Sequence, residues 1–237
     1  MLILGVDTSG KQGSIALLRF EEGEERAIEI VPLAGGTFSA QLIPQISDLL
    51  KKHNLGKSDI DAFAVASGPG SFTGLRVGLA AIKALAEILQ KPIAAVSLLE
   101  AVARGTEAQG KVLAILDAGR GEVYCGEYKV SDDCAHSVES TKGATTSAVL
   151  VSEELLNARE FLTRTEDALI ATPDEKIVDL ARENNLQVRQ VGRPRADAIA
   201  RLGFEKIQVG ETVSPEELDA NYIRRSDAEL QKSSIPK

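Results

Sequence analysis

The stretch Ser67-Gly-Pro-Gly-Ser-Phe-Thr-Gly74 separates two apolar segments of this chain. Before it, residues 63–66 form a short apolar run that predicts a buried strand. Glycine and proline then interrupt regular structure, because glycine tolerates positive φ and proline fixes φ. Ser71 or Thr73 can cap the free N–H groups at the start of a helix. The sequence therefore predicts a strand, a tight glycine loop and a helix, in that order.

The predicted helix from Leu75 to Leu89 is apolar around most of its circumference. Its charged residues form one narrow stripe, made of Arg76, Lys83 and Glu87. On one flank, small residues would let another backbone come close: Gly74, Gly78 and Ala81. A helix of this kind is buried on several sides. Two interpretations stay open, a central core helix or a helix shared between its own core and a partner protein. The three charges argue against a membrane span.

The composition favours a folded, acidic protein. The chain has 237 residues, 43% of them hydrophobic, and a formal net charge of −8. Because binding to a phosphate backbone needs a basic face, this balance argues against direct binding of nucleic acid. A local exception is the segment 189–201, which holds four arginines. We interpret this segment as a solvated face.

Cysteine and histidine are too few for a metal centre or a disulfide framework. Cys125 and Cys134 are nine residues apart, and His53 and His136 are far from one another in sequence. The start of the chain predicts a first strand in place of a signal peptide. We therefore expect a cytoplasmic protein.

A pattern at the start of the chain returns about 110 residues later. An apolar strand at 2–6 leads into Asp7-Thr8-Ser9-Gly10 and then a second strand at 14–20. Another apolar strand at 112–116 leads into Asp117-Ala-Gly-Arg-Gly121 and a strand at 122–130. This order indicates an internal duplication. We predict an N-terminal lobe of residues 1–104 and a C-terminal lobe of residues 105–237.

Helices are predicted between these strands. An amphipathic face, made of Leu42, Ile43, Ile46, Leu49 and Leu50, predicts a helix from Ser39 to His53. In the second half we predict a loop with one short strand at most over 131–150. Further helices are predicted from Ser152 to about Thr163, over 173–185 and over 196–207.

The stretch from Ser67 to Arg76 resembles the signature of the bacterial TsaB (YeaZ) family. Further segments resemble that family's pattern in the same order along nearly the whole chain: 2–9, 41–50, 117–124 and 221–224. Three positions depart from the pattern, namely Phe38 near a position where many members have histidine, Gly119 in place of arginine, and Ala220 in place of proline.

The resemblance implies an α/β, duplicated actin-like (ASKHA) fold with two lobes. Each lobe would open with a β-hairpin and continue as a mixed sheet flanked by helices. In that fold the hairpin turns face a phosphate site between the lobes, which makes Asp7, Thr8, Ser9 and Asp117 candidate cofactor-binding residues. The alternative is that both aspartates only accept hydrogen bonds from turn amides. No tightly bound cofactor is expected, although ATP or ADP would fit at an interface with partner subunits.

The resemblance also implies a non-catalytic scaffold subunit. It would bind and activate the TsaD transferase, which forms N6-threonylcarbamoyladenosine on tRNAs that read ANN codons. The ATPase TsaE would join the pair, self-association as a homodimer is allowed, and tRNA would be reached only through the complex. The expected partner interface lies on the first two helices: Leu42, Ile46, Leu49, Phe72, Thr73, Gly74, Val77, Gly78, Ala81 and Leu85.

Two alternatives from other functional classes stay open. One is a free-standing actin-like ATPase or phosphotransferase that uses Asp7 and Asp117. The other is a tRNA-binding module that uses the segment 189–201, which the net charge of −8 disfavours.

Overall fold

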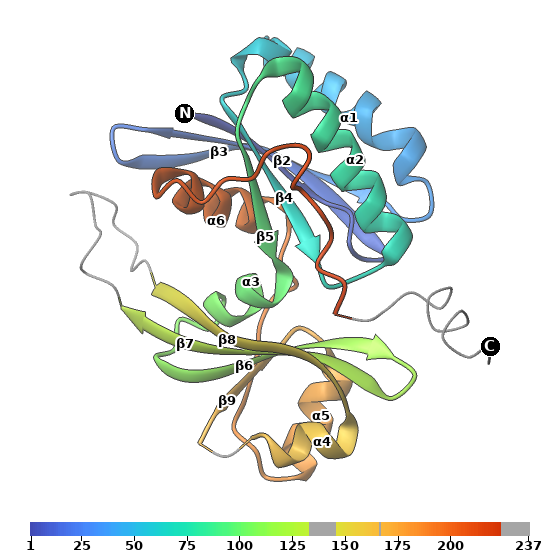
Figure 1. Ribbon diagram of the computed structural model, residues 1–237, viewed down its shortest axis with the longest axis vertical. Helices are drawn as coiled ribbons and strands as arrows, with labels where there is room; N and C mark the ends of the chain where they lie inside the picture. The colour runs from blue at the N-terminus through green and yellow to red at the C-terminus, as the bar shows by residue number, and fades with distance from the viewer. Residues whose placement is uncertain (133–145, 166, 224–237) are drawn as a thin grey trace, which may run out of the picture.

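The protein consists of two five-stranded sheets with helices around and between them (Figure 1). The structure is a computed structural model, and it describes residues 1–132, 146–165 and 167–223. Cys134 and His136 lie outside these ranges.

The elements follow the same order in both halves of the chain. The first half contains β1 (Leu2–Asp7), β2 (Gln12–Glu21), β3 (Glu24–Ala34), α1 (Phe38–Lys52), a 3-10 turn (Lys57–Asp59), β4 (Ala62–Gly68), α2 (Phe72–Leu89), β5 (Ile93–Ser97) and α3 (Leu98–Arg104). The second half contains β6 (Gly110–Gly119), β7 (Glu122–Asp132), β8 (Thr146–Asn157), α4 (Ala158–Thr163), β9 (Leu169–Thr172), α5 (Glu175–Glu183), β10 (Val188–Gln190) and α6 (Ala196–Gln208).

The two sheets have the same topology. The strand order is β3-β2-β1-β4-β5 in the first sheet and β8-β7-β6-β9-β10 in the second. In each sheet the opening three strands pair antiparallel, and the last two join in parallel. The predicted duplication and the predicted duplicated actin-like fold, with a hairpin and a mixed sheet in each lobe, are confirmed.

The last helix of each half packs on the sheet of the other half. α3 contacts β6, β7 and β8, whereas α6 contacts β1, β2, β4 and β5. Both helices therefore lie between the sheets, with α1 and α2 on the outer face of the first sheet and α4 and α5 on that of the second (Figure 1). The buried side chains between the sheets form one cluster that both lobes share.

This exchange corrects the predicted lobe boundary. The prediction assigned all residues after 104 to the second lobe, but α6 and the segment after it belong to the first. Val213 forms a bridge with Ile93, and Leu218 is fully buried in the core under α1 and α2. Conversely, α3 precedes residue 105 and packs on the second sheet. A boundary drawn from the repeat in sequence misses an exchange of helices in space.

The helix α2 begins and ends where its sequence allows. Ser71 caps its start, because the side-chain oxygen accepts a hydrogen bond from the Gly74 N–H at 3.3 Å. At its end Gln90 adopts the left-handed conformation. A buried stripe packs on β4 and α1: Leu75, Leu79, Ile82 and Ala86. No helix in the described ranges is both long and apolar enough to cross a membrane.

The predicted helix starting at Ser152 is wrong. Residues 146–157 form β8, which pairs with β7 from Thr146 opposite Asp132 to Asn157 opposite Glu122. The helix begins only at Ala158, where Asn157 and Glu160 form a reciprocal capping box. The run Ser-Glu-Glu-Leu-Leu suits a helix start in isolation, but pairing with a whole neighbouring strand outweighs this local preference.

Candidate functional site

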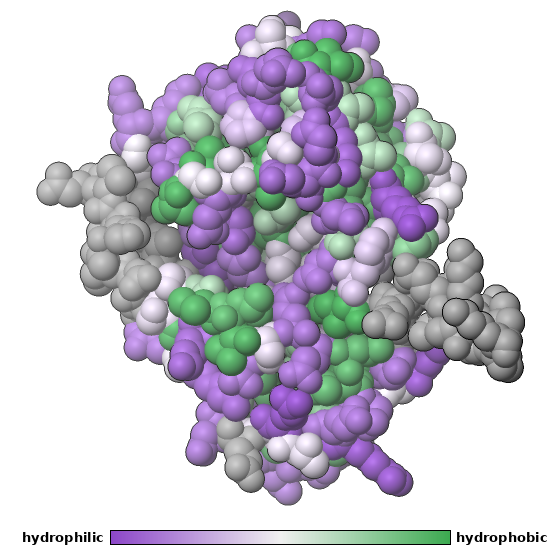
Figure 2. All heavy atoms as spheres, in the orientation of Figure 1, coloured by the Kyte–Doolittle hydropathy of each residue, from purple (hydrophilic) through white to green (hydrophobic). Residues whose placement is uncertain are grey.

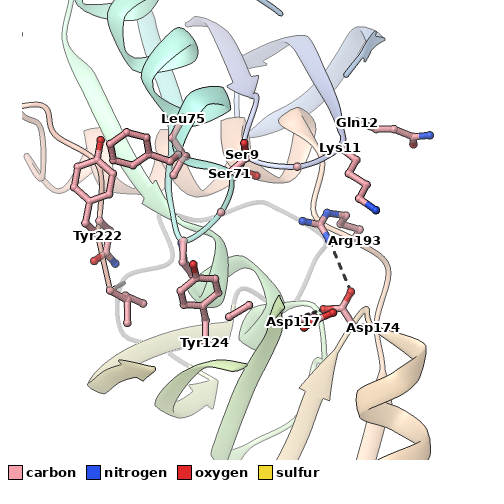
Figure 3. A pocket seen from close by; sticks show the side chains of 17 residues that line it. Ser9, Lys11, Gln12, Ser71, Leu75, Asp117, Tyr124, Asp174, Arg193 and Tyr222 are labelled. Atoms are coloured by element: carbon pink, nitrogen blue, oxygen red, sulfur yellow. Dashed lines mark hydrogen bonds and ion pairs between the residues drawn. The ribbon is translucent and has the colours of Figure 1, made fainter. Parts of the chain in front are cut away.

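A cleft of about 950 Å³ lies between the lobes, where the turns of both hairpins meet (Figure 3). The first lobe contributes the β1–β2 turn, from Ser9 to Gln12, and the loop before α2. The second lobe contributes Asp117, Asp174 and Tyr124, which lie opposite in Figure 3. The predicted cleft between the hairpin turns is therefore present.

The first hairpin turn is fastened to the start of α2. The Ser71 N–H donates to the Ser9 carbonyl oxygen at 2.6 Å, and the Thr8 hydroxyl donates to the Gly74 carbonyl oxygen at 2.7 Å. The Asp7 carboxylate accepts from the Ser9 N–H at 2.9 Å and is only 3% exposed. Burial raises the pKa of the Asp7 carboxyl, and the hydrogen bonding from Ser9 and the charge of Arg193 oppose this shift.

The second hairpin turn is more open. Asp117 is exposed, and its carboxylate accepts from the Gly119 N–H at 2.7 Å. The Asp117 N–H in turn donates to Asp174 at 2.8 Å. Asp174 also faces the guanidinium of Arg193 at 3.9 Å, drawn as a dashed line in Figure 3. This ion pair joins the β9–α5 loop of the second lobe to the segment that leads into α6.

The four predicted cofactor-binding residues therefore separate into two pairs. Ser9 and Asp117 line the cleft, but Asp7 and Thr8 do not. The structure supports the alternative given above for Asp7, which accepts a hydrogen bond from its own turn. Within the described residues, no group of three histidine, cysteine, aspartate or glutamate side chains is placed to hold a metal ion.

Sequence reasoning missed three charged residues that line the cleft: Lys11, Asp174 and Arg193. The only signal was the arginine-rich segment 189–201, to which Arg193 belongs. The other arginines of that segment have partners on the protein. Arg189 donates to the Thr106 carbonyl, Arg195 pairs with Asp197, and Arg201 pairs with Asp197 and Glu25. These contacts give the segment a structural role and offset part of its positive charge.

A second hollow, of about 480 Å³, forms a groove between α1 and α2. We call it the helix groove, and its lining residues are Ser39, Leu42, Ile43, Phe72, Thr73, Arg76, Val77, Ala80 and Ala81. Ile43 is 49% exposed and Phe72 is 37% exposed, so large apolar side chains face solvent here. Figure 2 shows green and pale surface over these two helices, at the upper right of the view.

Half of the predicted interface lies in the helix groove. Leu42, Phe72, Thr73, Val77 and Ala81 line it, with Leu42 buried at its floor. The other predicted residues Ile46, Leu49, Gly74 and Gly78 do not line the groove, because the chain's own core and hairpin turn cover them. Leu85 is half-buried against the same core. Reasoning from the sequence overlooked Ser39, Ile43, Arg76 and Ala80 as lining residues.

The small residues Gly74 and Gly78 on one flank of α2 are needed for the chain's own packing. A Cβ on Gly74 would stand 2.0 Å from the Thr8 carbonyl oxygen. A Cβ on Gly78 would stand 2.4 Å from the Thr8 hydroxyl oxygen. The prediction that a backbone comes close to this flank is therefore correct, but the backbone is that of the first hairpin turn.

Comparisons with known proteins agree with this architecture. The family model described as "TsaD: tRNA N6-adenosine threonylcarbamoyltransferase" matches residues 30–171. The tRNA threonylcarbamoyladenosine biosynthesis protein TsaB of Escherichia coli is 30% identical over 96% of both chains. The chain belongs to the TsaB family. The TsaB protein of Bacillus subtilis is 31% identical over 97% of this chain and 96% of its own.

Two solved structures of similar proteins share the fold of this TsaB-family chain. "YeaZ from Pseudomonas aeruginosa" is 25% identical, with a TM-score of 0.69 over 93% of this chain and 99% of that one. A second structure, of an uncharacterized protein with similarity to peptidase YEAZ from the same organism, is 26% identical, with a TM-score of 0.71 over 94% of this chain and 99% of that one.

The three positions that depart from the TsaB pattern have structural roles. Phe38 is buried, and its ring packs closely on Gly13. A Cβ on that glycine would lie 2.9 Å from a carbon of the Phe38 ring. Gly119 has a φ of +71°, a conformation that glycine adopts without strain. Ala220 is half-buried against the core under α1 and α2.

Proposed function

We propose that this chain is a non-catalytic scaffold subunit in the biosynthesis of tRNA threonylcarbamoyladenosine. It binds and activates a TsaD transferase, which modifies tRNAs that read ANN codons. Membership of the TsaB family supports the pathway, because the relatives carry that biosynthesis in their names. The observation that carries the scaffold role is the helix groove, where Ile43 and Phe72 expose apolar surface on a folded chain.

The groove is suited to a helix from another protein. Ala80 and Ala81 are small, so a second helix can approach α2 closely, and Ile43, Phe72 and Val77 supply apolar area. The core of a protein interface is apolar and depleted in charge, as this groove is. The exposed stripe continues along α2 to Ile88, which is 70% exposed.

The other partners in the proposal follow from the same complex. TsaE joins the pair of TsaB and TsaD, and the chain self-associates when TsaD is absent. The net charge of −8 favours contact with tRNA only through the complex, which acts in the cytoplasm. We propose no tightly bound cofactor, with ATP or ADP bound only at a boundary between this chain and its partners.

Reconstitution tests the proposed function. Threonylcarbamoyladenosine formation on a tRNA that reads an ANN codon is measured with all subunits present and with each subunit omitted. We expect modification to be lost when this chain is left out and restored when it is added back. Full modification without it would contradict the scaffold role.

The alternative function, a free-standing ATPase or phosphotransferase, rests on the cleft between the hairpin turns. Of its two proposed residues, Asp117 lines the cleft, but Asp7 is buried and does not, so this alternative is the weaker of the two. ATP turnover by the isolated chain that disappears in Asp7→Asn would support it.

A further inference from the structure

Arg76 is the one charged residue among those that line the helix groove. Its guanidinium carbon lies 3.7 Å from the centre of the Phe72 ring. Its Nε donates a hydrogen bond to the Tyr222 hydroxyl oxygen at 3.1 Å. The rings of Phe72 and Tyr222 are themselves 5.2 Å apart. The arginine is therefore held from two sides on the rim of an apolar surface, by its own helix and by the C-terminal segment.

The segment that carries Tyr222 is fixed to the body of the protein. The Asn221 N–H donates to the Ser67 carbonyl oxygen at 2.7 Å, and the Asn221 side chain donates to Glu153. Leu218, four residues before Tyr222, is fully buried. These contacts anchor the segment to the body of the protein, and the Tyr222 hydroxyl lies beside α2, where it accepts from Arg76.

Within the described part of the chain, the Arg76 guanidinium keeps donors available for a partner. Across residues 1–132, 146–165 and 167–223, Arg76 forms no ion pair with a carboxylate, and the bond to Tyr222 is its one hydrogen bond. When a partner covers the groove, water leaves this cation. Burying an unpaired charge is costly, so an occupant that fits must bring a negative group. A guanidinium held flat suits a carboxylate, which takes two parallel hydrogen bonds.

We propose that the occupant of the helix groove is a helix with a small, apolar face and one aspartate or glutamate that pairs with Arg76. Phe72 and Tyr222 are the positioning residues that hold the guanidinium for this carboxylate. The inference deepens the proposed function, since the occupant is a helix of the catalytic partner. A single cation in an otherwise uncharged groove specifies the register and direction of the incoming helix.

A second copy of this chain is the competing occupant. α2 carries Glu87 near its other end, so an antiparallel α2 from a second copy would bring Glu87 toward Arg76. The charges of α2 permit this pairing, so variants at both Arg76 and Glu87 distinguish a second copy from the catalytic partner.

The test uses the full chain with its catalytic partner and measures affinity by titration calorimetry at low and high salt. Arg76→Gln and Arg76→Lys should each weaken binding by about tenfold or more, because neither offers a forked pair of donors. Tyr222→Phe keeps the charge and the ring but removes the hydroxyl, so a smaller loss of about threefold is expected. Arg76→Gln should also flatten the dependence of affinity on salt, which a merely structural role would not do.

Ala80→Phe is the control, because it fills the groove without adding a charge. If Ala80→Phe abolishes binding while Arg76→Gln binds like the wild type with an unchanged salt dependence, the carboxylate inference fails and the docking surface stands. If Ala80→Phe also binds like the wild type, both the carboxylate inference and the proposed scaffold function fail. A homodimer that both Arg76→Gln and Glu87→Gln disrupt, with affinity for the catalytic partner unaffected, would overturn the proposal in favour of a second copy.

Discussion

Thr8 lies against Gly78, with its hydroxyl oxygen 2.4 Å from the point where a Cβ on that glycine would stand. The same hydroxyl donates its proton to the Gly74 carbonyl oxygen at 2.7 Å. One hydroxyl therefore joins the first hairpin turn to the central helix of the first lobe. Gly74 and Gly78 carry no side chain, and the first hairpin turn occupies the space that a side chain would need.

Gly74→Ala should destabilise the isolated chain. Its Cβ would meet the Thr8 backbone carbonyl oxygen at 2.0 Å, and backbone cannot turn away as a side chain can. We expect a loss of about 1–3 kcal/mol in the free energy of unfolding, measured by urea denaturation. Ala84→Ser, on the exposed side of the same helix, is the control and should stay within about 0.5 kcal/mol of the wild type. Equal stability of the Gly74→Ala and wild-type proteins would contradict the packing described.

Asp7→Asn should change how stability depends on pH. Burial raises the pKa of this carboxyl in the folded state above its ordinary value of 3.8, so the folded protein holds the proton more tightly than the unfolded chain. Asp7 therefore contributes stability below about pH 4 that is lost as the pH rises through its folded pKa. Asparagine does not titrate, so the Asp7→Asn variant does not lose stability in this way as the pH rises. Its side-chain oxygen can still accept the hydrogen bond of the Ser9 N–H.

The difference in unfolding free energy between Asp7→Asn and wild type measures this effect, since the other titrating groups cancel. From pH 3 to pH 7 the difference should move in favour of the variant. A difference that moves in favour of the wild type over this range would mean that the Asp7 carboxylate is stabilised, contrary to its burial.

Much of the fold could be predicted because it repeats. The strand, aspartate and glycine turn at Asp7 return at Asp117, and the two sheets have the same order. The helix over 39–53 also followed from its apolar period, and the structure places it at Phe38–Lys52. The spacing of apolar residues along a helix does not show which neighbour its apolar face packs against. Leu42, Ile46 and Leu49 form one face of α1, and that face is the chain's own core.

The candidate site was less predictable, since it depends on contacts between distant segments. Arg193 and Asp174 meet at the cleft, and Arg76 meets Tyr222 across 146 positions of the chain. No local pattern marks such pairs. The exchange of α3 and α6 between the lobes is of the same kind, because a helix that follows its strand in sequence can pack on either sheet.

Tyr128→Phe should weaken the joint between the lobes. The Tyr128 hydroxyl donates to Glu153 at 2.6 Å, and Glu153 also accepts from Ser97 at 2.7 Å and from Asn221. The Glu153 carboxylate therefore accepts hydrogen bonds from both lobes. Burial and the charge of Glu153 raise the pKa of the Tyr128 hydroxyl. Loss of a hydrogen bond to a charged group should cost about 1.5–3 kcal/mol of unfolding free energy.

A double-mutant cycle with Ser97→Ala checks whether the donors act as one network. The combined loss should differ from the sum of the single losses by at least about 0.5 kcal/mol, because both side chains serve the same carboxylate. Strict additivity would indicate that Tyr128 and Ser97 contribute independently.

The most direct measurement of the proposed scaffold role is the affinity of the full chain for its catalytic partner in a matched pair of variants. Ile43→Glu places a charge in the helix groove, where Ile43 is 49% exposed, and Val149→Glu places the same charge on β8 of the second lobe, where Val149 is 61% exposed. Ile43→Glu should weaken binding at least about 30-fold, or roughly 2 kcal/mol, while Val149→Glu binds like the wild type. Undiminished binding by a folded Ile43→Glu protein would contradict the account.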